Sequence, residues 1–267
     1  MQEARRHAIP AARDGLHPRT RKEDVPMKAL LTGHTHGLGA ALADALLARE
    51  VRVLGLSRGR APERAALQQV ALDLADSAAL ATWLAGDTLS EFLAGAGQVM
   101  LINNAGTLGP VKPPGRQSAP ALAQAVALNV AAPLMLADAL IAASPAAHDR
   151  RIAHVSSGAA RTPYAGWSVY CATKAALDQH ARAAALDAPA GCRIVSVAPG
   201  VIDTAMQAQI RATPDSDFPN RARFETLQRD GSLWSPADAA ARFVDHLLSP
   251  QFGDEAVVDL RMLYAAR

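Results

Sequence analysis

Seven short apolar runs recur along the chain, and stretches rich in alanine and leucine separate them. The runs are KALLTG (28–33), VRVLGLS (51–57), QVALDL (69–74), QVMLINNAG (98–106), RIAHVSSG (151–158), CRIVSVAPG (192–200) and EAVVDL (255–260). Such alternation is typical of parallel strands joined by helices. Because the runs are apolar on both faces and crossovers are right-handed, the pattern predicts an α/β fold: a doubly wound, seven-stranded parallel sheet with helices on both faces.

Two segments lie outside this alternation. Residues 1–26 contain no apolar core of a signal peptide, and their acidic residues argue against a transit sequence. We expect them to be a disordered extension or a misassigned start, with a single domain over 27–267. The irregular stretch at about 205–234 follows the sixth strand and predicts a mobile lid over the carboxyl ends of the strands, where ligands bind in such sheets.

One stretch, 118–144, is long and apolar, with Asp138 as its only charged residue. Its length is sufficient for a membrane span. Gln124, Asn129 and Pro133 also interrupt it, however, and much of the remainder is alanine, which is barely apolar. We therefore expect a buried or subunit-facing helix and no association with a membrane.

The formal net charge of +2 originates in the N-terminal segment. Residues 1–26 contain six Lys or Arg and four Asp or Glu, which leaves 21 of each sign in residues 27–267. A neutral body gives no compositional reason to expect nucleic acid as a partner. The two cysteines, Cys171 and Cys192, are too few for a disulfide framework and lack metal-ligand spacing, so we expect a cytoplasmic protein without a metal site.

A glycine-rich loop, TGHTHGLG, follows the first strand and opens the stretch 38–49, which we expect to be helical. Glycines there permit a tight turn and close approach of the backbone to a pyrophosphate, while the helix N-terminus supplies amide donors. Strand, loop, helix and second strand together predict a Rossmann fold with a dinucleotide site. The loop residues expected at the cofactor are Gly33, Thr35, His36, Gly37 and Leu38.

The end of the second strand bears on the choice between NAD and NADP. NAD-binding proteins usually place an acidic residue there, against the ribose 2′-hydroxyl. This chain has Ser57 and Arg58, a hydroxyl and a guanidinium that can hold a 2′-phosphate. We therefore predict NADP(H), the alternative being an ordinary solvated arginine. His36 either adds a weak donor to the same phosphate or faces solvent.

A tyrosine and a lysine four residues apart, Tyr170 and Lys174, begin another helical stretch and share one face of it. A neighbouring ammonium favours the phenolate and lowers the pKa of a phenol, so we expect Tyr170 to exchange a proton near neutral pH. Tyr164 lacks such a lysine, and we interpret it as a wall of the pocket.

Together these residues resemble the short-chain dehydrogenase/reductase family, over Lys28 to about Leu260. The motifs are TGHTHGLG, NNAG at 103–106, Asn129, the serine pair before YCATK, and PGVIDTAM at 199–206. The resemblance implies that Ser157 orients the substrate carbonyl and that Lys174 binds the nicotinamide ribose. It also implies that the main-chain carbonyl of Asn129 holds a water leading to Lys174. Since Pro133 has no N–H, that carbonyl lacks its helical donor, although a proline kink without catalytic meaning is the alternative.

The resemblance implies further contacts with the cofactor along the carboxyl ends of the strands, and subunit contacts through the helices around Asn129 and Tyr170. We therefore expect a homodimer or a homotetramer. The cofactor residues implied are Asp73, Leu74, Asn103, Ala105, Gly106, Tyr170, Lys174, Pro199, Gly200, Ile202 and Thr204.

The last third resembles the sepiapterin reductase and benzil reductase branch, through PGVIDTAMQAQIR, Phe224, Leu227, GSL at 231–233 and the terminal VVDL. This implies an NADPH-dependent reductase of a ketone or dicarbonyl, with Tyr170 as proton donor. Expected substrate residues are Tyr164, Trp167, Met206 and Asp259. In that branch the carboxylate aligned with Asp259 anchors nitrogen donors of a pterin, whereas a structural strand-end acid is the alternative.

Two other functions compete with the reductase. A dinucleotide-binding sensor would have this fold without turnover, but it has no need for a phenol and an ammonium four residues apart. An epimerase or dehydratase of the extended relatives is disfavoured by the glycine spacing and by the chain length of 267 residues.

Overall fold

The computed structural model describes residues 26–264, and its sheet confirms the predicted architecture. All neighbouring strands are parallel, and their order is β3-β2-β1-β4-β5-β6-β7. The strands are β1 (Met27–Thr32), β2 (Arg52–Ser57), β3 (Leu67–Ala71), β4 (Gln98–Asn103), β5 (Asp149–Val155), β6 (Cys192–Ala198) and β7 (Val257–Asp259). The order reverses between β1 and β4, and ligands bind at such a reversal, beyond the carboxyl ends of the strands. Apart from Pro26, the segment 1–26 lies outside the described residues.

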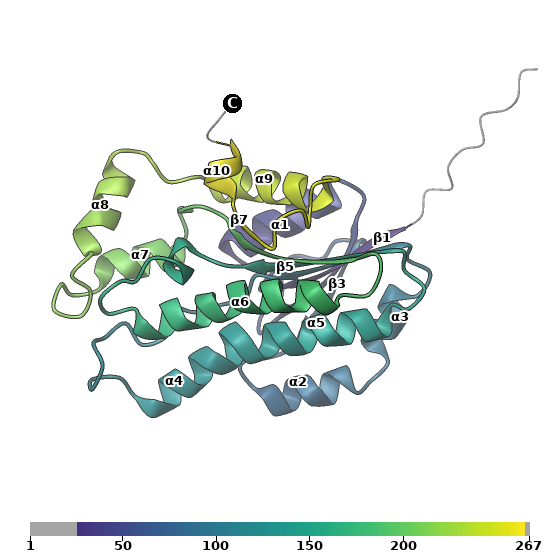
Figure 1. Cartoon of the computed structure of the whole chain (residues 1–267), viewed down its shortest axis with the longest axis horizontal. Helices are drawn as coiled ribbons and strands as arrows, with labels where there is room; N and C mark the ends of the chain where they lie inside the picture. The colour runs from purple at the N-terminus through teal and green to yellow at the C-terminus, as the bar shows by residue number, and fades with distance from the viewer. Residues whose placement is uncertain (1–25, 265–267) are drawn as a thin grey trace, which may run out of the picture.

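Helices cover both faces of the sheet (Figure 1). Because side chains alternate along a strand, Leu31 of β1 packs into one helix layer and Leu30 into the other. The first layer consists of α1 (Gly37–Leu47) and α9 (Pro236–Leu248). The second is built from α2 (Ser77–Leu84), α3 (Thr88–Leu93), α5 (Ala132–Ala143) and α6 (Ser168–Asp187). Two apolar clusters of comparable size thus hold the sheet from both sides.

The long apolar stretch forms a continuous helical rod of α4 (Ala119–Val126), a π-helical turn η1 (Ala127–Ala131) and α5. By length and composition alone, Ala119–Ala143 could cross a membrane. Ala132, Leu136 and Leu140 of this rod are nevertheless buried in the cluster beneath the sheet. It is therefore a core helix of the domain, in agreement with the sequence prediction.

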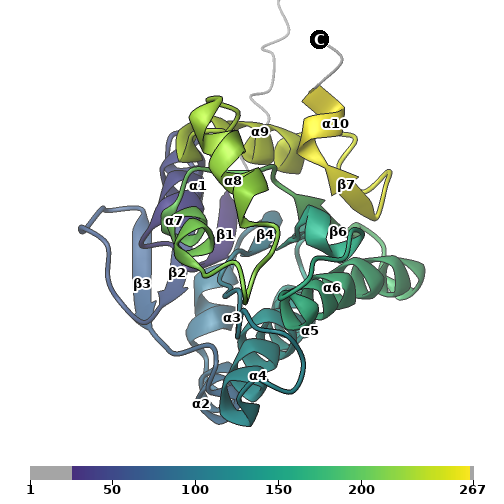
Figure 2. The ribbon, with the colours of Figure 1, turned by 90° about the vertical axis from the view of Figure 1, so that its left-hand side faces the viewer.

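The segment predicted to be irregular is largely helical, which corrects that expectation. It contains α7 (Ala205–Ala212) and α8 (Arg221–Arg229), joined by the turn around Pro214. Phe218 and Phe224 are buried against Trp167 and so attach the segment to the body. Figure 2 shows both helices in front of the strand ends. The described part of the chain ends with the short helix α10 (Leu260–Tyr264), directly after β7.

Candidate active site

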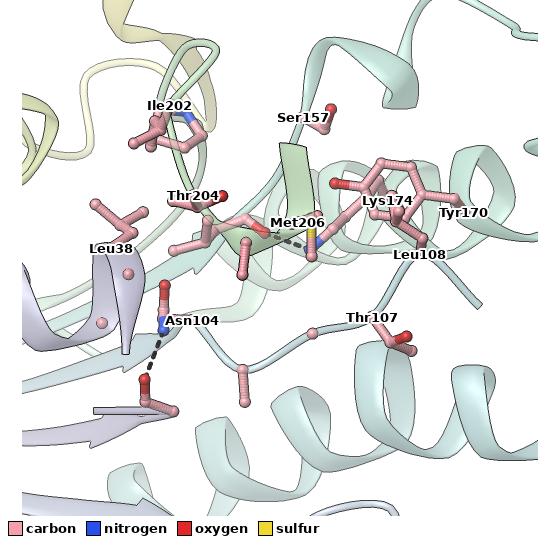
Figure 3. Close-up of a pocket in the computed structure, with 18 of the residues that line it drawn as sticks. Leu38, Asn104, Thr107, Leu108, Ser157, Tyr170, Lys174, Ile202, Thr204 and Met206 are labelled. Carbon is pink, nitrogen blue, oxygen red and sulfur yellow. Dashed lines mark hydrogen bonds between the residues drawn. The ribbon is translucent and has the colours of Figure 1, made fainter. Parts of the chain in front are cut away.

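A cavity of about 780 Å³ opens at the carboxyl ends of the strands, between the glycine-rich loop and α7 (Figure 3). It brings together nearly all the residues singled out in the sequence. Three lie outside its lining: Asn103, Asn129 and Asp259. The fold therefore gathers residues from the ends of six strands, β1 to β6, into one continuous groove.

The glycine-rich loop is held against the ends of β2 and β4. Gly33 adopts a positive φ of 69°, and its N–H donates to the carbonyl of Leu56 at 2.8 Å. The amide Nδ2 of Asn104 donates to the carbonyls of Thr32 and Gly33 at 3.0 and 3.3 Å. A Cβ on Gly39 would collide with the carbonyl oxygen of Gly33, so only glycine lets α1 begin this close to the loop. The exposed start of α1 then presents its amide donors to the cavity, as a pyrophosphate requires.

A group of hydroxyl and basic side chains lines the cavity where β2 ends. The Ser57 hydroxyl lies 3.3 Å from that of Thr35, and the Thr35 hydroxyl lies 2.8 Å from Nδ1 of His36. Arg58 is exposed beside them. This corner of the cavity therefore offers hydroxyl and guanidinium donors of the kind that a phosphate accepts.

Asp73 and Leu74 line the same end of the cavity, where the adenine is expected. The carboxylate of Asp73 accepts the N–H of Ala75 at 3.0 Å, so it also caps its own turn. The predicted residues at 199–204 line the opposite wall, and a short bridge between Ile202 and Trp234 fixes them.

Ser157, Tyr170 and Lys174 converge in the middle of the cavity (Figure 3). Ser157 follows β5, and its hydroxyl accepts the N–H of Ala159 at 3.1 Å, which begins the short 3₁₀ helix Gly158–Ala160. Ser157 also lies close enough to Tyr170 to favour the ionised form of its hydroxyl. Nζ of Lys174 lies 5.8 Å from the centre of the Tyr170 ring and donates to the carbonyl of Val155 at 2.7 Å. The three side chains are thus fixed by the first turns of α6 and the end of β5.

The pKa of Tyr170 is raised in this structure, whereas the spacing of Tyr170 and Lys174 predicts that it is lowered. Burial raises the pKa of Tyr170 to about 12, against the opposing effect of Ser157. Burial also lowers the pKa of Lys174 to about 8, although the carboxylate of Asp178, one turn along α6, acts in the other direction. Desolvation therefore outweighs the pairing that the spacing of the two residues suggests.

Asn129 lies behind the cavity wall, in the π-helical turn. Its Oδ1 accepts the N–H of Thr107 at 2.9 Å, and its Nδ2 donates to the carbonyl of Thr107 at 2.8 Å and to the hydroxyl of Thr173 at 3.1 Å. A Cβ on Gly106 would lie 3.4 Å from Oδ1 of Asn129 and 3.6 Å from Nζ of Lys174. Asn129 is thus close to Lys174, and the turn widens just before Pro133, as a missing N–H donor permits.

Two residues predicted to contact ligands, Asn103 and Asp259, lie outside the cavity lining, and their contacts stay predictions. Asn103 is buried beneath the sheet, where its Nδ2 donates to the carbonyl of Pro133 at 3.2 Å and lies 3.0 Å from His154. Asp259 does not point into the substrate end of the cavity. Arg261 holds it instead, through its N–H and Nε on Oδ1 at 3.0 and 3.1 Å and through Nη2 on Oδ2 at 2.7 Å.

The cavity is also lined by residues that no sequence motif indicated. Asn104, not Asn103, faces the cavity, because neighbouring residues at a strand end point to opposite sides. Arg223 of α8 and Arg261 of α10 line the substrate end. No motif marks either arginine, since each reaches the cavity from a surface helix.

Aromatic side chains build the substrate end around the tyrosine. The rings of Tyr164 and Trp167 are 5.2 Å apart, and those of Trp167 and Tyr170 are 5.4 Å apart. Met206 and Phe224 complete this wall from the lid. Tyr164, Trp167 and Met206 therefore line the same part of the cavity as Tyr170, and their contact with a substrate stays a prediction.

Comparisons with known proteins agree with this geometry. The model of a family described as short chain dehydrogenase matches residues 27–215. A benzil reductase ((S)-benzoin forming) of Bacillus cereus is 34% identical over 241 residues, which cover 86% of this chain and 97% of that protein. A sepiapterin reductase of Meriones unguiculatus is 32% identical over 249 residues, 86% of this chain and 94% of that protein. The solved structure of a short-chain dehydrogenase/reductase from Burkholderia vietnamiensis is 48% identical, covers 89% of this chain and 98% of its own, and superposes with a TM-score of 0.64.

Proposed function

The chain belongs to the short chain dehydrogenase family of NAD(P)(H)-dependent oxidoreductases, and on that premise we propose that it is an NADPH-dependent reductase of a ketone or dicarbonyl. The observation that carries the proposal is the convergence of Ser157, Tyr170 and Lys174 in the same cavity as the glycine-rich loop. Both groups of relatives are named as reductases, which supports carbonyl reduction as the direction.

The cavity fits a dinucleotide because the glycine-rich loop and the first turn of α1 line its cofactor end, where the helix N-terminus supplies amide donors for a pyrophosphate. The nicotinamide of the bound cofactor would supply the hydride. Ser157 and Tyr170 would hold the ketone oxygen between their hydroxyls, and Tyr170 would donate its proton to that oxygen. Lys174 would hold the ribose and stabilise the phenolate that remains.

The pKa values support this direction of proton transfer. With a pKa of about 12, Tyr170 carries its proton at neutral pH, and its donation requires that the phenolate which forms be stabilised. Lys174, with a pKa of about 8, is still mostly charged there. A buried phenolate that forms during the reaction gains most from a fixed positive charge in the low-dielectric cavity. The chain is therefore suited to reduction near neutral pH, where the phenol carries its proton.

The corner formed by Thr35, His36, Ser57 and Arg58 supports NADPH as the cofactor. A 2′-phosphate would receive hydroxyl donors and a guanidinium there, since the residue directly after β2 is Arg58 and not an acid.

The oxidation of NADPH in the presence of benzil, followed at the nicotinamide absorbance band, tests the proposal. We expect turnover by the wild type, and we expect Tyr170→Phe to reduce kcat by about 10²–10⁴-fold, since the phenolic proton is lost while the ring still packs. NADPH affinity should change little. NADPH binding without turnover on any carbonyl compound would indicate the sensor instead, and a Tyr170→Phe enzyme with near wild-type kcat would contradict the assignment of the proton donor.

A further inference from the structure

The charged side chains that line the cavity are unevenly distributed in sign. Among the described residues, four are basic and one is acidic: Arg58, Lys174, Arg223, Arg261 and Asp73. Arg58 and Asp73 lie at the cofactor end, and Lys174 belongs to the proton-transfer group. The proposed reaction gives no role to Arg223 or Arg261, which both line the substrate end.

Tyr164 connects the two unassigned arginines. Nη1 of Arg223 donates to the Tyr164 hydroxyl at 2.8 Å, and its guanidinium lies 5.7 Å from the centre of the ring. Arg261 hydrogen-bonds Asp259 and is also close enough to Tyr164 for an electrostatic interaction. The Nη2 atom of Arg261 would lie 3.7 Å from a Cβ on Gly158, the residue after Ser157. One guanidinium therefore flanks the Ser157 loop, and the other lies at the outer end of the aromatic wall.

Both guanidiniums keep donors available for a ligand. Arg261 uses Nε and Nη2 on Asp259, and Nη1 has no acceptor in the part of the chain that the structure describes. For Arg223, no carboxylate lies within 4.0 Å among residues 26–264. Guanidinium donors match the geometry of a carboxylate, and they bind it more strongly than they bind a neutral oxygen.

We infer that the substrate end of this cavity selects an aryl 2-oxo acid, whose carboxylate binds Arg261 and is attracted by Arg223. The aryl group would lie along Tyr164 and Trp167, and the ketone would face Ser157 and Tyr170. The inference rests on the proposed reductase and specifies its substrate class. A hydride from NADPH forms the new C–H bond at the ketone carbon, Tyr170 protonates the oxygen, and the products are a 2-hydroxy acid and NADP⁺. Because Arg261 already holds Asp259, that carboxylate is not free for the nitrogen donors of a pterin.

Phenylglyoxylate and its methyl ester provide the test, because they share the ring and the ketone and differ in the charge. We expect Arg261→Gln to raise KM for the acid about tenfold or more while the ester changes by less than about twofold. Arg223→Gln should act in the same direction with a smaller effect, since Arg223 is exposed. Arg229→Gln is the matched control: it is on the same helix, interacts with Asp230 at 3.5 Å and does not line the cavity.

Arg261→Lys keeps a cation near Asp259 and should recover part of the loss, which separates charge recognition from a disturbed fold. Higher ionic strength should raise KM for the acid and leave that for the ester unchanged. Equal effects of Arg261→Gln on acid and ester, or no effect on either, would overturn the inference.

The reductase activity and the carboxylate site can be tested independently of each other. Benzil and the ester carry no charge, so their reduction by NADPH tests the reductase without the arginines. If no ketone is reduced, calorimetric titration of phenylglyoxylate into the enzyme with NADP⁺ still decides the question. A Kd raised about tenfold by Arg261→Gln but not by Arg229→Gln supports the carboxylate site, and an unchanged or undetectable affinity rejects it.

Discussion

The proposed preference for NADPH rests on Ser57 and Arg58 at the end of β2, and it gives the first prediction. We expect Ser57→Asp combined with Arg58→Ala to lower NADPH affinity by about 10–150-fold, because charge-assisted hydrogen bonds worth ~1.5–3 kcal/mol are replaced by repulsion. NADH affinity should stay the same or improve, since an acid there accepts the ribose 2′-hydroxyl. Titration with both dinucleotides measures the change. A wild type that uses NADH and NADPH with equal kcat/KM would contradict this interpretation before any substitution.

The lysine gives a prediction about pH. Lys174 has a pKa of about 8, so it carries its charge below that pH and loses it above. Tyr170, with a pKa of about 12, stays protonated across the working range. We therefore expect kcat/KM for ketone reduction to be level near neutrality and to fall as the pH rises through about 8, because kcat/KM reports the free enzyme.

Lys174→Arg is the control for the pH profile. A guanidinium keeps its charge well beyond pH 10, so the decline near pH 8 should disappear even if the absolute activity is lower. A wild-type profile that rises through pH 8, or a decline that persists in Lys174→Arg, would show that another group titrates.

From residue types and spacings we could predict which side chains meet in the cavity, but not how buried each one is. Ser157, Tyr170 and Lys174 lie together as their spacing suggests, but burial was not visible in the sequence, and burial reverses the expected pKa shift of Tyr170. The position of Asp259 at the end of β7 was predictable, whereas the arginine two residues later that holds it was not. Such pairings depend on side-chain directions that spacing alone does not determine.

At the scale of elements, the π-helical turn before Pro133 connects the helical rod to the site. Pro133→Ala restores an N–H that can bond the carbonyl of Asn129 and tighten the turn. We expect the melting temperature to hold or to rise, while kcat falls by ~2–10-fold, the equivalent of one hydrogen bond worth ~0.5–1.5 kcal/mol. The loss should arise because the Asn129 carbonyl is no longer available to the water chain implied by the family.

Pro120→Ala is the matched control in the same rod. Pro120 lies in the first turn of α4, where an N–H has no helical partner in any case, so we expect no change in kcat. A Pro133→Ala enzyme with unchanged kcat would make this bend of the rod a structural feature only.

Element boundaries follow the apolar pattern where both faces are buried and depart from it elsewhere. The central strands β1, β4 and β6 begin within one residue of their predicted starts. They end one to three residues before the predicted ends. The edge strand β3 begins earlier, at Leu67, and ends at Ala71, because one neighbour alone defines its pairing. Proline and aspartate at 214–217 do form a turn, and helices lie on both sides of it, with Ile210 of α7 and Phe224 of α8 buried in the same apolar cluster. The local turn signals therefore marked the turn itself but not the two helices, which tertiary packing stabilises.

At the scale of the whole molecule, the apolar surface of the helices around Asn129 is only partly covered by the rest of the domain. The helices α4, α5 and α6 lie together on one side of the sheet (Figure 1), and Val126 at the end of α4 is 48% exposed. The family resemblance implies that the helices around Asn129 and Tyr170 form subunit contacts. The expected particle in solution is therefore a homodimer or a homotetramer, with two or four times the mass of 27.9 kDa.

Light scattering after gel filtration measures this mass, and Val126→Glu tests which surface makes the contact. If this surface forms a two-fold symmetric contact, the interface contains the new carboxylate twice. Each unpaired buried charge costs about 3–5 kcal/mol. We therefore expect the variant to dissociate to smaller particles with an unchanged domain fold. Ala65→Glu, in the exposed loop before β3, is the control and should keep the wild-type mass. A wild type of 27.9 kDa at micromolar concentration would contradict the oligomer itself. If Val126→Glu keeps the full mass, the contact lies on another face, and the exposed side of α4 is then an ordinary solvated surface.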